Sequence, residues 1–417
     1  MLQFFPALAV LKRGDFRMLL TARAVAIMGL QAQDMIIGWQ VYSLTHSPFI
    51  LGLTGLAEAV PALVCALFAG HFVDNNRPHL LFQFALGGLM LTALMLCLVG
   101  GGYIGGLPLL TILFIGIFLS GLARSFLMPA SSSLLSQAVP RNEIAGAAAW
   151  MSSGYQLAAI IGPAIAGLLY GASGVAIVWW MPVILMTIGL LAMRRMGGEL
   201  RVYQPVSKRE PMGKSIRGGL RFILDNPVLL SVMLLDMFAV LFGGAVAMLP
   251  AYADQVLHVG AEGLGVLRAA TAIGSIVTAV FLALRPFKII RANMLLQVIT
   301  GFGICIIGFG ISENFAFSFI CLALSGAFDS VSMVIRGTLM QLLTTNEVRG
   351  RVSAVNSMFI ISSNEIGAFE SGTAAKLLGL VPSVVFGGVM CLVVVASTAL
   401  ISPKFRRTQV TADSLIS

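Results

Sequence analysis

Long apolar stretches separated by short polar intervals fill almost the whole chain. Each stretch has about 20 or more residues, enough for a helix to cross a hydrocarbon core of about 30 Å. A membrane strand would instead alternate apolar and polar residues. The pattern predicts twelve transmembrane helices, over residues 17–43, 50–72, 79–100, 107–132, 143–170, 173–193, 227–252, 262–284, 289–311, 314–340, 350–376 and 381–402.

Composition agrees with a membrane protein. Of 417 residues, 58% are hydrophobic and 10% are charged, whereas an average soluble domain has roughly 25% charged residues. All five cysteines lie inside predicted helices at scattered spacings, which argues against disulfides or a zinc site. We therefore expect packing cysteines, no metal and no cofactor.

The basic residues predict the orientation. Of 26, 21 fall in the N-terminal arm, the even-numbered connections or the C-terminal tail, and Lys376 alone lies near an odd-numbered connection. By the positive-inside rule both termini are cytoplasmic. The net charge of +9 then reflects attraction to the anionic inner leaflet, and nucleic acid is not an expected partner.

The longest polar interval divides the predicted helices into six and six. We predict an N-terminal half over residues 1–193, a cytoplasmic linker over 194–226, a C-terminal half over 227–403 and a cytoplasmic tail over 404–417. The linker ends in GKSIRGGLRFILDNP, whose apolar periodicity suits a helix on the membrane surface.

A repeat relates the two halves at an offset of 204 or 205 residues. Ser120-Gly121 corresponds to Ser325-Gly326, Asn142-Glu143 to Asn346-Glu347, and the pair Gly162 and Gly167 to Gly367 and Gly372. Several matches at one offset predict two homologous six-helix halves. In such proteins the substrate site lies between the halves near the bilayer midplane and opens alternately to each side.

The chain resembles the major facilitator superfamily, and within it the bacterial efflux branch with enterobactin-type siderophore exporters and macrolide efflux proteins. The resemblance is carried by IIGWQVYSLTHSPFILGLTGLAEAVPAL, LDMFAVLFGGAVAMLPAYADQVLHVGAEGLGVLRAA and RGRVSAVNSMFIISSNEIGAFESG. It implies an all-α fold of twelve helices in two pseudo-symmetric halves. It also implies a monomeric carrier of a small molecule in the bacterial inner membrane.

The superfamily's loop signature after the second helix appears here as GHFVDNNRPH, with departures at Asn75, Pro78 and His79. Further charged residues precede or begin the fifth and eleventh helices, where they suit helix caps or pairs that close the cytoplasmic side. The candidate cytoplasmic gate residues are Gly70, Asp74, Arg77, Glu143, Glu347, Arg349 and Arg351. A weak antiporter-like motif, GPAIAG, predicts a kink in the fifth helix at Gly162, Pro163 and Gly167.

Six acidic residues fall well inside predicted helices. Exposing all six to lipid would cost on the order of 15 to 20 kcal/mol, so they must face a cavity, pair or be protonated. Each alternative makes them proton-coupling candidates, and Glu58 is expected to meet Glu365, Glu370 or Asp34. The six are Asp34, Glu58, Asp236, Asp329, Glu365 and Glu370.

Other polar or aromatic residues inside the helices are candidates for the substrate cavity. The repeat places Arg124 opposite Asp329, which allows an ion pair across the cavity, although static ties between helices are an alternative. The cavity candidates are Gln31, Gln33, Trp39, Gln40, Arg124, Tyr155 and Arg336.

No catalytic motif is present, because the four histidines map to loops or helix ends and no metalloprotease, nucleophile-elbow or phosphate-loop pattern occurs. The chain is therefore not expected to be an enzyme. The favoured hypothesis is a proton-coupled exporter, an antiporter, of a small amphipathic molecule such as a siderophore or drug. A uniporter, a carrier of a lipid or metabolite, and a membrane receptor or structural protein remain alternatives.

Overall fold

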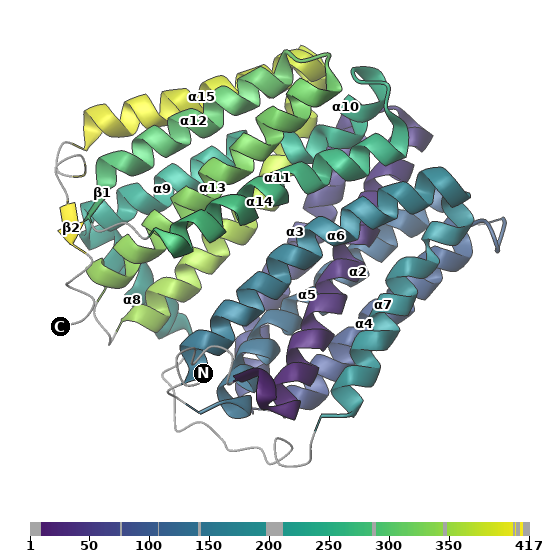
Figure 1. Ribbon diagram of the computed structural model, residues 1–417, viewed down its shortest axis with the longest axis horizontal. Helices are drawn as coiled ribbons and strands as arrows, with labels where there is room; N and C mark the ends of the chain where they lie inside the picture. The colour runs from purple at the N-terminus through teal and green to yellow at the C-terminus, as the bar shows by residue number, and fades with distance from the viewer. Residues whose placement is uncertain are drawn as a thin grey trace. The chain divides into compact units, whose positions relative to one another are not determined.

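The computed structural model describes residues 10–75, 77–106, 108–140, 143–196, 212–285, 289–344, 348–402, 405 and 409–411. These residues are helical apart from turns and one short ladder of two strands (Figure 1). The elements are η2 (Val10–Lys12), α2 (Gly14–Thr45), α3 (Pro48–Asn75), α4 (Pro78–Gly100), α5 (Leu109–Ala138), α6 (Ile144–Val178), α7 (Trp180–Arg194), α8 (Met212–Asp225), α9 (Pro227–Phe242), η5 (Ala245–Met248), α10 (Leu249–Gln255), α11 (Gly260–Leu284), β1 (Ile289–Arg291), α12 (Ala292–Gly310), α13 (Phe315–Leu343), α14 (Arg349–Leu378), α15 (Leu380–Ile401) and β2 (Gln409–Thr411).

Nine stretches of the described chain are long and apolar enough to cross a membrane. Helix α7 is apolar but has only 15 residues. Helices α2 and α14 have 32 and 30 residues but carry charged side chains along their length, including Asp34 and Glu370. The nine are Pro48–Cys65, Pro78–Gly100, Leu109–Ala138, Gly146–Val178, Pro227–Gln255, Gly260–Leu282, Ala292–Gly310, Phe315–Leu343 and Leu380–Ile401.

The chain forms two compact units. The first comprises Met1–His46, Ala57–Lys208 and Gly260–Ala269, and the second comprises Ser47–Leu56, Arg209–Val259 and Ala270–Ser417. The sequence-based division at the linker differs from this grouping in two places, because the start of α3 clusters with the second unit and the start of α11 with the first. Each unit is thus completed by a piece of helix from the other half of the sequence.

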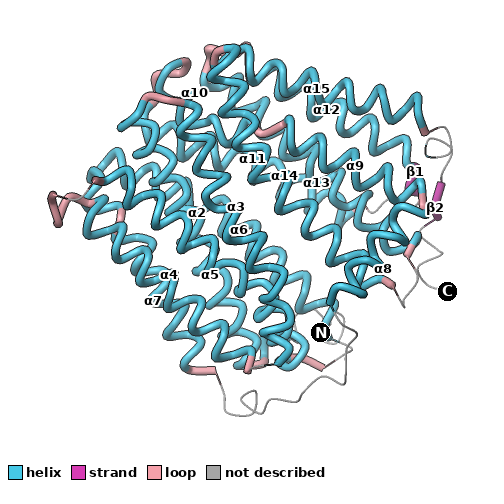
Figure 2. The backbone as a smooth tube through the Cα atoms, turned by 180° about the vertical axis from the view of Figure 1, so that it is seen from behind, coloured by secondary structure: helices cyan, strands magenta, loops and turns pink. Residues whose placement is uncertain are grey.

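The same helix packing occurs in both units. In the first, α2 packs against α6 and α7, and α4 packs against α5 and α7. In the second, α9 packs against α14 and α15, and α12 packs against α13 and α15. Figure 2 shows that the loops it draws between these helices are short. The equivalent pairs support the internal repeat inferred from the sequence.

The repeated glycines make a further helix contact in each unit. A Cβ atom added to Gly167 would lie 2.7 Å from Cα of Gly265, and one added to Gly372 would lie 2.7 Å from Cα of Gly52. Each contact brings two helix backbones together where only glycine fits. The first contact joins α6 to α11 in the first unit, and the second joins α14 to α3 in the second unit. The repeat therefore preserves a backbone contact.

The predicted kink at Gly162, Pro163 and Gly167 stays a prediction, because the one break recorded inside α6 lies further along the helix. Pro163 lies within α6, but the backbone leaves helical geometry at Gly174, where φ is 77° and ψ is 178°. An L residue with a side chain rarely adopts this positive φ, so glycine permits the break. The break falls close to the predicted boundary between residues 170 and 173.

The predicted linker and tail contain structure that hydropathy did not fully predict. Helix α8 was expected on the membrane surface. Its Leu220 and Leu224 are exposed, but Ile223 is fully buried with Leu229 and Val352. Residues 289–291 were predicted as helix but form β1, which pairs antiparallel with β2 of the predicted tail.

Candidate functional site

A cluster of half-buried charges forms the candidate site in the first unit. It unites Asp34 of α2, Glu58 of α3 and Arg124 of α5. Arg124 donates a very close hydrogen bond from Nη1 to Glu58 Oε1, and the same nitrogen lies 3.7 Å from Asp34 Oδ2. One guanidinium therefore holds two carboxylates from different helices.

Arg268 of α11 adds a second cation to this cluster through an electrostatic interaction with Asp34. The four groups, two acids and two bases, have no net formal charge. Their side chains remain partly accessible, at 27% for Asp34, 16% for Glu58 and 35% for Arg124. We name these four residues the first charge centre.

Two glutamines of α2, one before and one after Asp34 in the sequence, serve as ties between helices. Gln33 is 1% exposed, and its Nε2 donates to Ser120 Oγ of α5 at 2.8 Å. Gln40 donates to the Gly100 carbonyl at 2.9 Å and accepts from Trp179 Nε1 at 3.1 Å. Gln40 was predicted to line a substrate cavity, but both ends of its amide are used in fixing α2.

The second unit holds a sealed ion pair. Arg336 of α13 makes a very close contact with Asp236 of α9, and their side chains are only 8% and 9% exposed. The sequence placed Arg336 on one face of α13 with Asp329, two turns away, but the structure pairs it with another helix. Arg336 was predicted to line the substrate cavity, and here it is buried instead.

A cavity of about 20 Å³, near the size of one water molecule, adjoins this pair. It is lined by Asp236, Asp329 and Ser332 together with apolar residues of α9, α12 and α13. No described residue forms an ion pair with Asp329. We name Asp236, Asp329 and Arg336 the second charge centre. Its formal charge is −1 when both acids are ionised.

Comparison with known proteins identifies the family. The family model described as a transmembrane secretion effector, of major facilitator type, matches residues 5–415. The chain belongs to this family. Since the matched relatives and structures are all transporters, this protein is a multi-pass membrane transporter and not an enzyme.

The relatives include enterobactin exporters. The chain is 25% identical over 395 residues to the enterobactin exporter EntS of Escherichia coli O1:K1, covering 94% of this chain and 92% of that protein. EntS of Shigella boydii serotype 4 matches with the same identity and coverage. At this identity and coverage, the two EntS proteins are remote relatives that align with this chain over most of its length.

Solved transporters share the fold. A bacterial homologue of the human lysosomal transporter Spinster, in an inward-facing and unoccupied conformation, has a TM-score of 0.71 and 14% identity, with coverage of 94% of this chain and 98% of that one. A POT family transporter in complex with a thioalcohol-conjugated peptide has a TM-score of 0.74 and 12% identity, with coverage of 94% and 96%. At these identities the likeness concerns the fold alone.

An ion pair ties two helix starts of the transporter's first unit. Arg13, just before α2, donates to both carboxylate oxygens of Glu143, just before α6, at 2.8 and 3.1 Å. This hydrogen bond holds the pKa of Glu143 below its usual range. Glu143 was expected to cap α6. It occupies the N-cap position but makes no side-chain cap bond.

The remaining gate candidates are described only in part. Arg77 is exposed at the N-cap position of α4. Gly70 and Asp74 lie in the last turns of α3, and Arg349 and Arg351 begin α14, but their side chains are outside the described set. Glu347 lies outside the described residues. A gating role for this group stays a prediction.

The other cavity and coupling candidates are scattered. Trp39 packs edge-on against Tyr170 with ring centres 6.4 Å apart, and Tyr155 is 43% exposed. Gln31 lies against Gly162 where α2 meets α6. Glu365 and Glu370 are half-buried in the second unit. Their meeting with Glu58, and the pair of Arg124 with Asp329, join residues of different units and stay predictions.

Sequence reasoning missed three polar residues that complete these centres. Arg268 lies in a predicted helix. The high cost of placing a charge in lipid, which singled out the acidic residues, applies equally to this arginine. Ser120 was noticed only as part of the repeat, and Ser332 was not noticed. Serine is common in membrane helices as a packing residue, so the sequence offered no signal for either one.

Proposed function

We propose that this transporter is a proton-coupled exporter of the bacterial inner membrane, and that its coupling centre is the first charge centre. The observation that carries the proposal is the guanidinium of Arg124 shared between Asp34 and Glu58. The likeness to enterobactin exporters supports export of a small amphipathic molecule such as a siderophore. We take the protein to act as a monomer.

The proposed topology has twelve membrane-spanning helices with both termini in the cytoplasm. Besides the nine apolar stretches, α2, α7 and α14 would cross the membrane. The charges that lower the hydropathy of α2 include Asp34 and Arg23. Because isolated charges in lipid are costly, the partly accessible first charge centre would face water. The bias of basic residues supports cytoplasmic termini.

Coupling would arise because a proton and the substrate compete for the same carboxylates. A substrate with hydroxyl or amine donors would bind ionised Asp34 and Glu58 from the cytoplasmic side. A proton entering from outside would neutralise one carboxylate, weaken those hydrogen bonds and release the substrate outward. Each proton that moves inward contributes about 2.3 kcal/mol per 100 mV of membrane potential.

Arg124 and Arg268 would keep the centre balanced during this exchange. With both acids ionised, two cations face two anions, so the empty site carries no net charge. When Glu58 takes up a proton, Arg124 still has Asp34 within 3.7 Å. The guanidinium is thereby never left without a carboxylate, which limits the cost of each step.

Transport in reconstituted liposomes tests the proposal. Purified protein would be sealed with a lumenal pH dye and offered enterobactin, other siderophores, macrolides and cationic dyes in turn. Glu58→Gln keeps the side chain's shape but cannot titrate, and Asp225→Asn changes an acid that is 73% exposed on α8. We expect one compound to drive proton movement in wild type and Asp225→Asn but not in Glu58→Gln.

Two outcomes would contradict the proposal. Substrate flux without proton movement would indicate a uniporter or a carrier coupled to another ion. Proton movement that persists unchanged in Glu58→Gln would remove the first charge centre from the coupling mechanism. The broader assignment to the transporter family does not depend on either result.

A further inference from the structure

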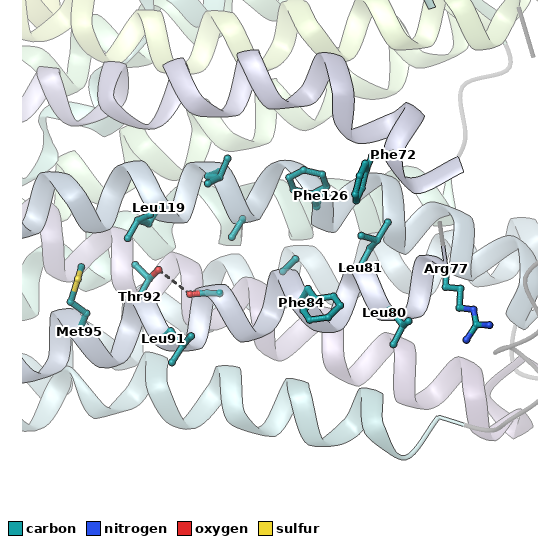
Figure 3. Close-up of a pocket in the computed structure, with 14 residues that line it drawn as sticks. Phe72, Arg77, Leu80, Leu81, Phe84, Leu91, Thr92, Met95, Leu119 and Phe126 are labelled. Atoms are coloured by element: carbon teal, nitrogen blue, oxygen red, sulfur yellow. Dashed lines mark hydrogen bonds between the residues drawn. The ribbon is translucent and has the colours of Figure 1, made fainter. Parts of the chain in front are cut away.

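The first unit carries a long apolar groove that the transport cycle proposed above does not use. Its volume is about 1010 Å³, and it runs along α4 and α5 with Phe72 of α3 on one side (Figure 3). Small side chains line part of it, and the Cβ of Ala123 is the nearest atom to the open position beside Gly88. The groove exists because two neighbouring helices present small residues at the same level.

The body of the groove offers no hydrogen bond to a ligand. Among the residues that line it, only Arg77 and Thr92 are polar. Thr92 Oγ1 donates to the Gly88 carbonyl of its own helix at 2.9 Å, as the dashed line in Figure 3 marks. The hydroxyl is therefore engaged by the backbone, and the groove suits a purely hydrocarbon ligand.

One end of the groove is positively charged. Figure 3 places Met95 at one end and Arg77 at the other. Arg77 is exposed and precedes the first turn of α4, where the helix dipole adds positive potential. Met95 lies eighteen positions after Arg77, which corresponds to about 27 Å along a helix. This length exceeds the roughly 15 Å of hydrocarbon in one leaflet.

The groove is open on its outer side rather than covered by protein. Phe84 is 75% exposed, Leu91 is 61% exposed and Phe72 is 50% exposed. On a helix that crosses the bilayer, such an apolar surface lies against hydrocarbon. Its ligand must therefore be apolar along its length and negatively charged at the end that reaches Arg77.

We propose that this groove binds one acyl chain of an anionic phospholipid, with the phosphate on Arg77. The chain would lie between α4 and α5 while the headgroup remains at the interface. This inference rests on the proposed function at one point only, which is the assignment of Arg77, and hence of the lipid, to the cytoplasmic leaflet. Lipid binding itself requires neither substrate nor protons, so it can fail or succeed independently of antiport.

Two glycines on α4 provide a matched test of the groove. No heavy atom outside the helix lies within 4 Å of a Cβ added to Gly87, and only Ala123 Cβ lies within that distance of one added to Gly88, at 3.7 Å. The Cβ of a new side chain is thus accommodated at either position of the same helix, but of the two glycines only Gly88 lines the groove. Gly88→Leu would fill it, and Gly87→Leu is the control.

Native mass spectrometry of the full-length protein in detergent gives the readout. Dioleoyl phosphatidylglycerol and dioleoyl phosphatidylcholine have identical chains and would be titrated separately. We expect wild type and Gly87→Leu to retain a phosphatidylglycerol molecule that Gly88→Leu loses. Equal lipid retention by the two leucine variants would overturn the proposal. A Gly88→Leu variant that keeps its lipid but changes its oligomeric mass would also overturn it.

A second pair of variants tests the headgroup. Arg77→Gln is expected to lower the preference for phosphatidylglycerol over phosphatidylcholine roughly fivefold, with the bound chain retained. Arg17→Gln removes one exposed charge from α2 of the same unit, outside the groove, and should leave the preference unchanged. An equal loss in both variants would mean attraction by net charge alone and would contradict a headgroup site at Arg77.

Discussion

The two charge centres occupy equivalent units but differ in chemistry. In the first unit Arg124 joins Asp34 and Glu58, with Arg268 nearby, and the side chains remain partly accessible. In the second, Asp236 and Arg336 are sealed below 10% exposure, and Asp329 has no ion-pair partner among the described residues. The repeat conserves helix packing, whereas the charges have diverged.

One pair of equivalent positions shows this divergence clearly. An offset of 205 residues relates Arg124 of α5 to Asp329 of α13, so the repeat carries opposite charges at the same place. The cation in the first unit contacts two acids, while the anion in the second adjoins a cavity of about 20 Å³. One unit therefore holds its charges where they are partly accessible, and the other holds an ion pair that is almost fully buried.

The largest expected effect comes from breaking the sealed pair of the second unit. Asp236→Asn leaves Arg336 buried without an anion, which should lower the free energy of unfolding by about 3 to 5 kcal/mol. Glu58→Gln should cost much less, because Arg124 is partly accessible and keeps Asp34. Thermal unfolding in detergent would compare the two. A similar loss in both variants would remove the distinction between a static and an exchangeable centre.

The double variant Asp236→Asn with Arg336→Gln sharpens the same comparison. Removing both charges should recover most of the lost stability, because neither partner is then left as an uncompensated ion. Recovery would be measured as the coupling energy of a double-mutant cycle. Additive losses would instead mean that the two residues act separately.

The glycine contacts should respond alike in the two units. Gly167→Ala and Gly372→Ala each force a Cβ to within 2.7 Å of a facing Cα, which should destabilise the protein by about 1 to 3 kcal/mol. Gly337→Ala has no neighbour within 4 Å at the added Cβ and should be neutral or slightly stabilising. A cost confined to one of the two contacts would argue against equivalent packing.

Asp329→Asn is expected to have a smaller effect on stability. Its effect on transport distinguishes a residue that exchanges protons from one that only ties helices together. Removing a charge that no described cation balances should leave stability unchanged or raise it by up to about 1 kcal/mol. If Asp329 also exchanges protons, the variant will transport substrate with altered proton movement. A marked loss of stability would instead mean that Asp329 is a structural tie like Asp236.

The smallest effect is expected for the exposed pair of Arg13 and Glu143. Because the pKa of Glu143 is lowered in the folded protein, the pair's contribution is present above the usual glutamate pKa and is lost as pH falls through the lowered value. Glu143→Gln should therefore lower the melting temperature slightly at pH 7 and by less at about pH 3. An equal difference at both pH values would contradict this linkage.

Much of the fold follows from hydropathy because the apolar runs are long and their ends carry proline or glycine. The predicted stretch 79–100 corresponds to α4, which begins at Pro78, and 381–402 corresponds to α15, which follows Gly379. The stretch 227–252 was predicted as one helix, but α9 ends at Phe242 before Gly243 and Gly244. An adjacent pair of glycines was the available signal.

The candidate site was predictable in residue type but not in pairing. The cost of charge in lipid singled out Asp34, Glu58 and Asp236 without any structure. Their partners depend on how each helix is rotated and on which helices touch, and Arg336 lies 100 positions from Asp236. Contacts at such separations leave no local pattern in a single sequence.

Proton release during substrate binding tests the central claim most directly. A compound that drives proton movement in liposomes would be titrated into detergent-solubilised protein in two buffers of different ionisation enthalpy. If the substrate and a proton compete for the first charge centre, wild type will release protons on binding substrate, in an amount that depends on pH, and Glu58→Gln will not. Binding with the same proton exchange in both proteins would contradict a coupling role for the carboxylates held by Arg124.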